Sequence, residues 1–171
     1  MHGEEPCYTL GMATTSELKL SVRLFLKAYR WRTNSPIPWT PLKKPLSDCR
    51  VAVVSSAGFV PIGSKKFDEE IRGGDSSFRI VPSNTLPTDL ADSHRSESFD
   101  HTAMEADPDL AFPLTRIREL CEEGFLGEVA PRHLSYMGSI TATGPLIRDS
   151  APAGAAQLVL DEVDLVLLVP V

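Results

Sequence analysis

The stretch Arg50-Val-Ala-Val-Val-Ser-Ser-Ala-Gly58 decides the fold of this chain. Its first six residues form a short, β-branched, apolar run, which is typical of a strand that is buried on both faces of a sheet. The small residues Ser56, Ala57 and Gly58 that follow indicate a tight turn. We therefore predict that residues 50–55 are the first core strand of an α/β protein.

Helices and apolar strands alternate through the rest of the chain. Residues 114–124 carry a helical stripe that ends at a glycine, and residues 125–130 are expected to resume as a strand. A further helix is predicted over 151–162, and DLVLLVPV (164–171) is the most apolar strand candidate, expected to be the most buried. This alternation predicts a mostly parallel sheet flanked by helices, a Rossmann-like three-layer arrangement that is incomplete at the C-terminus.

The N-terminal part has a different character. A helix is expected from Ser16 to about Asn34, and residues 36–45 hold four prolines and a tryptophan, which predicts an extended strap. The predicted division is therefore 1–48, an N-terminal helix and strap, and 49–171, the N-terminal part of a single α/β domain.

Composition narrows the class of partners. The 171 residues are 42% hydrophobic, and their net charge of −6 is made of mixed signs. This argues against a nucleic-acid surface and favours a soluble protein that handles a small molecule or protein partners. No signal peptide or membrane-spanning run of about 18 apolar residues is present, so we expect a cytoplasmic protein without membrane association. Cys7, Cys49 and Cys121 lack CxxC spacing and are expected to be reduced.

Two glycine- and serine-containing segments are candidate sites. Ser55 and Ser56 end the first strand, but no GxSxG elbow surrounds them, so we predict a substrate-binding role and not a hydrolase nucleophile. Gly63-Ser-Lys65 inverts the order of a phosphate-binding loop, and nucleotide binding is not expected. In GGDSSFR (73–79), Asp75 either caps a tight turn or acts with Arg79 to bind a polar substrate or hold a loop.

The histidines offer proton-transfer chemistry. His94 lies in SHRSESFDH (93–101), close to Asp100, and an imidazole beside a carboxylate can shuttle protons near neutral pH. A solvated polar loop is the alternative interpretation. The spacing matches no compact metal site, so no metal is predicted. His133 follows a predicted strand end and is a second candidate.

The position of the last strand bears on catalysis. In open α/β sheets, reactive groups collect beyond the carboxyl ends of the strands, and the sequence stops there, at Val171. We therefore expect that no catalytic residue lies within the chain and that a continuation carries it.

From about residue 22 onward the chain resembles the selenoprotein B family of glycine, sarcosine, betaine and D-proline reductases. The matching segments, in order, are WTPL (39–42), VAVVSSAG (51–58), GDSSFR (74–79), SH (93–94), DH (100–101), DPDLAFP (107–113), RIREL (116–120), EG (123–124), APRH (130–133), YMG (136–138), AP (151–152) and residues 163–171.

This resemblance implies a redox residue, selenocysteine or cysteine, directly after Val171, with UGA read as a stop. It also implies reductive cleavage of a C–N bond in an amino acid or related amine. The implied partners are a pyruvoyl-containing subunit and a thiol or selenoprotein electron donor, with no bound cofactor. The alternatives are a non-catalytic binding subunit or truncated remnant that docks to a partner, and a small-molecule-binding module that uses the Ser56–Gly58 turn as an anion site.

Overall fold

The computed structural model describes residues 18–29, 33, 35–96 and 101–171. The chain forms two compact units, residues 1–40 and residues 41–171. In the first unit, helix α1 (Leu20–Ala28) lies within the predicted helix, and none of its residues is buried. The expected cap at Ser16 lies outside the described residues. Residues 35–45 contain no helix or strand.

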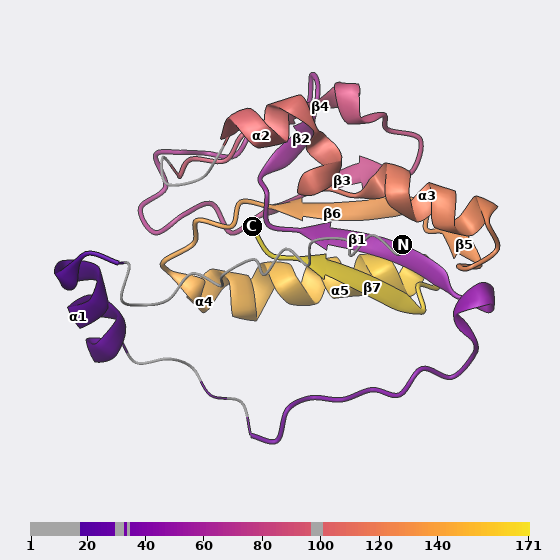
Figure 1. Ribbon diagram of the computed structural model, residues 1–171, viewed down its shortest axis with the longest axis horizontal. Coiled ribbons are helices and arrows are strands. Elements are labelled where there is room, and N and C mark those ends of the chain that lie inside the picture. The colour runs from indigo at the N-terminus through magenta and orange to yellow at the C-terminus, as the bar shows by residue number, and fades with distance from the viewer. Residues whose placement is uncertain (1–17, 30–32, 34, 97–100) are drawn as a thin grey trace, which may run out of the picture. The chain divides into compact units, whose positions relative to one another are not determined.

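The second unit is built on a five-stranded sheet (Figure 1). Strand β1 (Arg50–Ser55) pairs in parallel with β5 (Glu128–Val129), β6 (Arg132–Tyr136) and β7 (Leu165–Val169). Since β7 pairs along residues 51–55 of β1, β5 and β6 share the opposite edge of β1. Strand β3 (Phe78–Pro82) runs antiparallel to β6. The turn η2 (Leu46–Asp48) leads into β1.

The region between Gly58 and Phe112 contains a second sheet and several short helical elements. Strands β2 (Phe59–Pro61) and β4 (Leu90–Asp92) form a separate antiparallel sheet. The short helical elements of this region are η3 (Pro87–Asp89), α2 (His101–Ala106) and η4 (Pro108–Leu110). These elements carry several of the predicted site residues.

Helices pack on both faces of the main sheet, and β1 supplies core residues to each. Val51 and Val53 pack with Phe112 and with Ile117 of α3 (Leu114–Glu122). Ala52 faces the other side, where it packs with Leu134 and Leu158. That side is covered by α5 (Ala151–Leu160), which follows the short turns α4 (Thr143–Pro145) and η5 (Leu146–Ser150). This strict alternation along β1 explains why the whole run is apolar.

The α/β class is confirmed, but the sheet is mixed. Three strands pair in parallel with β1, but β3 is antiparallel and a second small sheet is present, so the structure is not clearly the mostly parallel, Rossmann-like three-layer arrangement that was predicted. Strand β6 was not predicted, because its inward residues include His133 and Ser135 and the apolar signal is broken. His133 follows the end of β5, which lies within the predicted strand 125–130, but it also lies inside β6, a strand that was not predicted.

Strand β7 was expected to be the most buried, and it is not. Among the described residues it pairs only with β1, and Leu168 is 69% exposed. An edge position leaves one side of the strand uncovered, although its residues are apolar on both faces. Within the described part of the chain, no helix has the length and apolar character needed to cross a membrane.

Candidate functional site

The carboxyl ends of β1, β6 and β7 meet at one edge of the sheet. Ser55 pairs with Ser135 of β6 on one side and with Val169 of β7 on the other. The three strands are parallel, so the residues that follow each of them emerge together. This edge of an open α/β sheet is where ligands usually bind.

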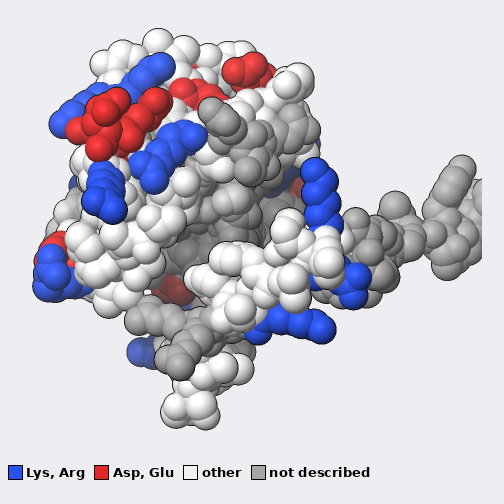
Figure 2. Space-filling view, turned by 90° about the vertical axis from the view of Figure 1, so that its left-hand side faces the viewer, with Lys and Arg blue, Asp and Glu red and all other residues white. Residues whose placement is uncertain are grey.

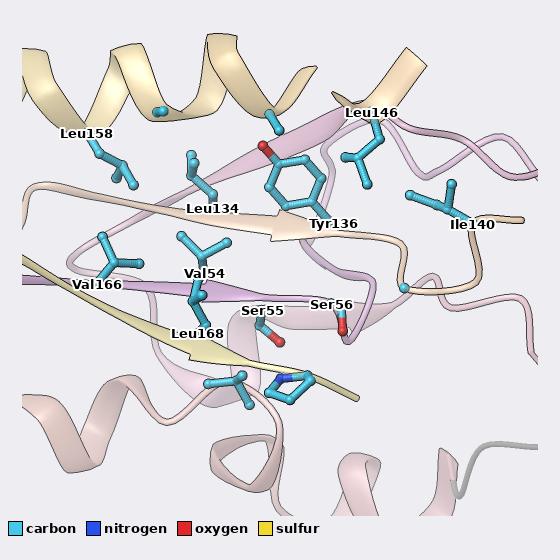
Figure 3. Close-up of a pocket in the computed structure, with 15 residues that line it drawn as sticks. Val54, Ser55, Ser56, Leu134, Tyr136, Ile140, Leu146, Leu158, Val166 and Leu168 are labelled. Atoms are coloured by element: carbon cyan, nitrogen blue, oxygen red, sulfur yellow. The ribbon is translucent and has the colours of Figure 1, made fainter. Parts of the chain in front are cut away.

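A pocket of about 780 Å³ lies between α5 and the sheet and reaches this edge (Figure 3). Its volume falls within the range of roughly 300–1,000 Å³ that is usual for small-molecule sites. Its lining includes Val54, Ser55, Ser56, Leu134, Tyr136, Gly138, Ile140, Leu146, Leu158, Val166, Leu168, Val169 and Pro170. None of the lining residues is charged, so the pocket favours an apolar group over a carboxylate.

Tyr136 supplies the largest polar side chain of the pocket. Its hydroxyl donates to the carbonyl oxygen of Ser150 at 3.2 Å, and burial raises the pKa of this phenol. A Cβ atom at Gly154 would lie 2.4 Å from the Tyr136 hydroxyl, so the glycine of α5 allows this close approach. The sequence analysis did not select Tyr136. Its place in YMG (136–138), a segment that matches the family, was the available signal.

Both predicted serines line the pocket, but their hydroxyl groups are engaged by the main chain. Ser55 Oγ donates to the carbonyl oxygen of Ala111 at 2.6 Å and accepts the N–H of Ala57 at 3.1 Å. Ser56 Oγ accepts the N–H of Val171 at 2.9 Å. These contacts fix the β1 turn and the end of β7.

Arg79 and Asp75 form a clamp on the loop before β3. All five guanidinium N–H groups of Arg79 have partners, and its Cζ lies 4.3 Å above the ring of Phe67. The acceptors are the carbonyl oxygens of Lys65, Lys66 and Phe78, Ser77 Oγ and Asp75 Oδ2. The guanidinium therefore has no N–H left for a substrate in this arrangement. Of the two roles predicted for Arg79, these contacts favour holding the loop over binding a substrate.

The carboxylate of Asp75 accepts hydrogen bonds within the same clamp. Burial raises its pKa, but hydrogen bonds from Ser77 and from the N–H of Asp68 outweigh this effect, and the pKa lies below the ordinary value. Asp68 N–H donates to Oδ2 at 3.0 Å and Ser77 N–H donates to Oδ1 at 2.9 Å. Asp75 thus acts as a turn cap.

The histidine cluster is formed by His94, His101 and Asp92. His101 Nδ1 bonds to the carboxylate of Asp92, and the rings of His94 and His101 lie 6.1 Å apart. The hydrogen bond to Asp92 raises the pKa of His101, whereas burial lowers the pKa of His94. Because the pKa values of the two imidazoles are shifted in opposite directions, the pair is a candidate for proton transfer. Asp92 and His101 were not among the selected pocket residues.

His133 is fully buried on the opposite face of the sheet from the pocket, the face packed by Phe112. Its Nδ1 accepts the backbone N–H of Val53 at 2.9 Å, and the ring of Phe112 meets it edge-on at 6.3 Å. Burial, with a smaller contribution from Arg118, lowers its pKa to about 4. A neutral, enclosed imidazole of this kind serves the fold.

The remaining predicted residue, Asp100, lies outside the described residues. Within the described part of the chain, no group of three or more His, Cys, Asp or Glu side chains is arranged to hold a metal ion. The selected residues therefore separate into the pocket edge (Ser55 and Ser56), the loop clamp (Asp75 and Arg79), the histidine cluster (His94) and the core (His133).

Charged side chains lie elsewhere on the surface. At the upper left of Figure 2, acidic and basic side chains gather next to one another. This fits the mixed charge of the sequence.

An α/β domain whose parallel strands open at their carboxyl ends onto a pocket has the architecture in which small molecules usually bind. The chain belongs to the glycine/sarcosine/betaine reductase selenoprotein B family, whose model matches residues 18–170. This confirms the resemblance seen in the sequence.

Two curated relatives are similar to the chain. D-proline reductase subunit gamma of Acetoanaerobium sticklandii is 34% identical over 133 residues, which are 78% of this chain and 53% of the relative. Sarcosine reductase complex component B subunit beta of Peptoclostridium acidaminophilum is 28% identical over 155 residues, 88% of this chain and 34% of the relative. The chain thus spans about half the length of the first and a third of the second. No solved structure matches.

Proposed function

We propose that this chain is part of a reductase-complex subunit that cleaves a C–N bond in an amino acid or related amine. Family membership over residues 18–170 supports this, as do the relatives, which are named as subunits of D-proline and sarcosine reductases. The structural observation that carries the proposal is the contact of Val171 with Ser56, because it brings the end of β7 to the pocket edge.

The redox group, in this proposal, is a selenocysteine or cysteine that follows Val171 in the full-length protein. A selenol is largely ionised at neutral pH, whereas a thiol with a pKa of about 8.5 is mostly protonated. The described cysteines are poor alternatives. Cys49 is fully buried, its thiol lying 3.2 Å from the carbonyl oxygen of Pro45, and burial raises the pKa of Cys121.

The other groups have supporting roles in this proposal. Ser55 and Ser56 lie at the pocket edge, where they fix the β1 turn and the end of β7. Asp75 and Arg79 hold the loop before β3, and His133 serves the core of the sheet. His94, with the Asp92–His101 pair, is a candidate source of the proton that the leaving amine requires. A pyruvoyl-containing partner subunit would activate the amine, and a thiol or selenoprotein would supply electrons.

The test begins with the coding sequence beyond Val171. An in-frame UGA or cysteine codon followed by further coding sequence is expected. The full-length protein, combined with a pyruvoyl-containing partner and dithiothreitol, is then assayed with glycine, sarcosine, betaine and D-proline. Serine in place of the redox residue should abolish turnover.

Two outcomes contradict the proposal. The first is a coding sequence without selenocysteine or cysteine at that position. The second is a serine variant with full activity. Either outcome would favour the non-catalytic binding subunit.

A further inference from the structure

The side chain of Ser56 takes the place of one backbone hydrogen bond between β1 and the end of β7. The parallel pairing of β1 with β7 continues past Ser55, since the N–H of Ser56 donates to the carbonyl oxygen of Val169 at 3.1 Å. In a regular parallel ladder, the next bond would run from the N–H of Val171 to the carbonyl oxygen of Ser56. In this structure the carbonyl oxygen of Ser56 instead accepts the N–H of Gly138 at 2.8 Å, and the N–H of Val171 bonds elsewhere.

The Ser56 hydroxyl takes the place of the diverted carbonyl. Ser56 Oγ accepts the N–H of Val171 at 2.9 Å and lies 3.3 Å from the carbonyl oxygen of Val171, to which it can donate. Pro170 has no N–H, so Val171 is the first residue after Val169 that can donate to β1. One hydroxyl therefore holds both main-chain polar groups of Val171.

Gly138 makes this junction possible. A Cβ atom there would lie 2.6 Å from the carbonyl oxygen of Ser56 and 3.1 Å from that of Val171. The end of β6 thus approaches the backbone of both partners more closely than a side chain allows. Ser56, Gly138 and Val171 form one backbone junction, which ties the ends of three parallel strands together.

We propose that Ser56 is a positioning residue that sets the direction in which the chain leaves β7, and thereby orients the redox residue toward the pocket. This inference rests on the proposed function, in which that residue follows Val171. A residue next to a fixed N–H and C=O has little freedom to turn away from the pocket edge, whereas loss of the hydroxyl leaves the N–H of Val171 without its partner.

The experiment uses the full-length protein and compares Ser56→Ala with Ser56→Thr, which keeps a hydroxyl. Ser64→Ala is the matched control, because Ser64 Oγ also bonds to a main-chain carbonyl oxygen, that of Pro61 at 2.6 Å, but in an exposed turn. Two quantities are measured. They are the hydrogen-exchange rate of the Val171 amide and the pH profile of iodoacetamide alkylation at the residue after Val171, read by mass spectrometry.

In Ser56→Ala, the Val171 amide should exchange several-fold, up to about tenfold, faster, and the alkylation profile should shift in pH. Ser56→Thr and Ser64→Ala should both show the Val171 exchange rate and the alkylation profile of the wild type. Unchanged exchange and an unchanged profile in Ser56→Ala would overturn the inference. A third outcome separates this inference from the proposed function: Val171 exchange becomes faster in Ser56→Ala, but mass spectrometry finds no selenocysteine or cysteine after Val171. In that case the hydrogen bond is confirmed, whereas the orienting role and the proposed function are both contradicted.

Discussion

The imidazole of His133 completes the hydrogen bonding of Val53, whose backbone N–H it accepts on Nδ1 at 2.9 Å. Strand β5 pairs with residues 50 and 51 of β1, and β6 pairs with residues 54 and 55, which leaves a gap in the ladder between them. The side chain of His133 fills this gap. Its Nδ1 acts as an acceptor, so the proton of the neutral ring is assigned to Nε2.

Replacing His133 by phenylalanine should therefore destabilise the fold. The aromatic ring fills a similar volume, but the buried N–H of Val53 loses its acceptor, at a cost of about 1–3 kcal/mol. Urea unfolding at pH 7.5 measures this difference. Ser64→Ala, at an exposed turn, should leave the unfolding midpoint unchanged, and equal midpoints for wild type and His133→Phe would contradict the structural role.

The same histidine should make stability fall as the pH is lowered. Its pKa is about 4 in the folded protein and 6.5 in the unfolded chain, so between these values only the unfolded chain binds the proton. Stability is thus fully present above pH 6.5 and declines toward pH 4, by about 3 kcal/mol in total. The urea midpoint of the wild type should drop across this window, and that of His133→Phe should drop less. Identical pH profiles would exclude this contribution.

The clamp of Arg79 predicts that lysine cannot replace it. A lysine ammonium has three donors and lacks the planar fork that reaches Lys65, Lys66 and Asp75 together. In Arg79→Lys, trypsin should cut the loop after Lys65 and Lys66 faster, and stability should fall by about 1–3 kcal/mol. Arg116→Lys is the control, since Arg116 pairs only with Glu119 in its described hydrogen bonds, on an exposed surface. Equal cleavage rates for the two variants would argue against the clamp.

Asp92 should govern the protonation of His101. Because its hydrogen bond is the largest cause of the raised pKa, Asp92→Asn should lower the pKa of His101 toward 6.5. An NMR titration of the histidine ring signals measures this shift. Glu105→Gln should have a smaller effect, because Glu105 makes the smallest contribution. A His101 pKa that does not change in Asp92→Asn would show that the pair does not form in solution.

Local patterns predicted some elements, and long-range contacts decided the others. Strand β1 and helices α3 and α5 follow from runs and stripes of apolar residues, because burial imposes those periods. Strand β6 escaped prediction because the polar residues His133 and Ser135 lie in its core face, where Val53 and other partners distant in sequence satisfy or enclose them.

The same limit applies to the site. The sequence identified the small-residue turn and the serines at the end of β1, but Arg79 bonds to residues 13 and 14 positions away and His101 to one 9 positions away. Such pairings arise from tertiary packing and leave no local signature. Asp75 and Arg79 were grouped because they are four residues apart, and their side chains do contact each other, at 3.4 Å.

The close approach at Gly138 gives the sharpest prediction for the pocket edge. Gly138→Ala adds a Cβ that would lie 2.6 Å from the carbonyl oxygen of Ser56, so β1 and β6 must separate at this point. The backbone of Gly138 has no positive φ, and the cost, about 1–3 kcal/mol, is therefore steric overpacking. Gly144→Ala is the matched control, because a Cβ at Gly144 meets nothing within 4 Å. Thermal unfolding should show a lower midpoint for Gly138→Ala and an unchanged or slightly higher one for Gly144→Ala. Equal unfolding midpoints for the two variants would show that the ends of β1, β6 and β7 are not as close together as described. The position of Val171 at the pocket edge would then have to be revised.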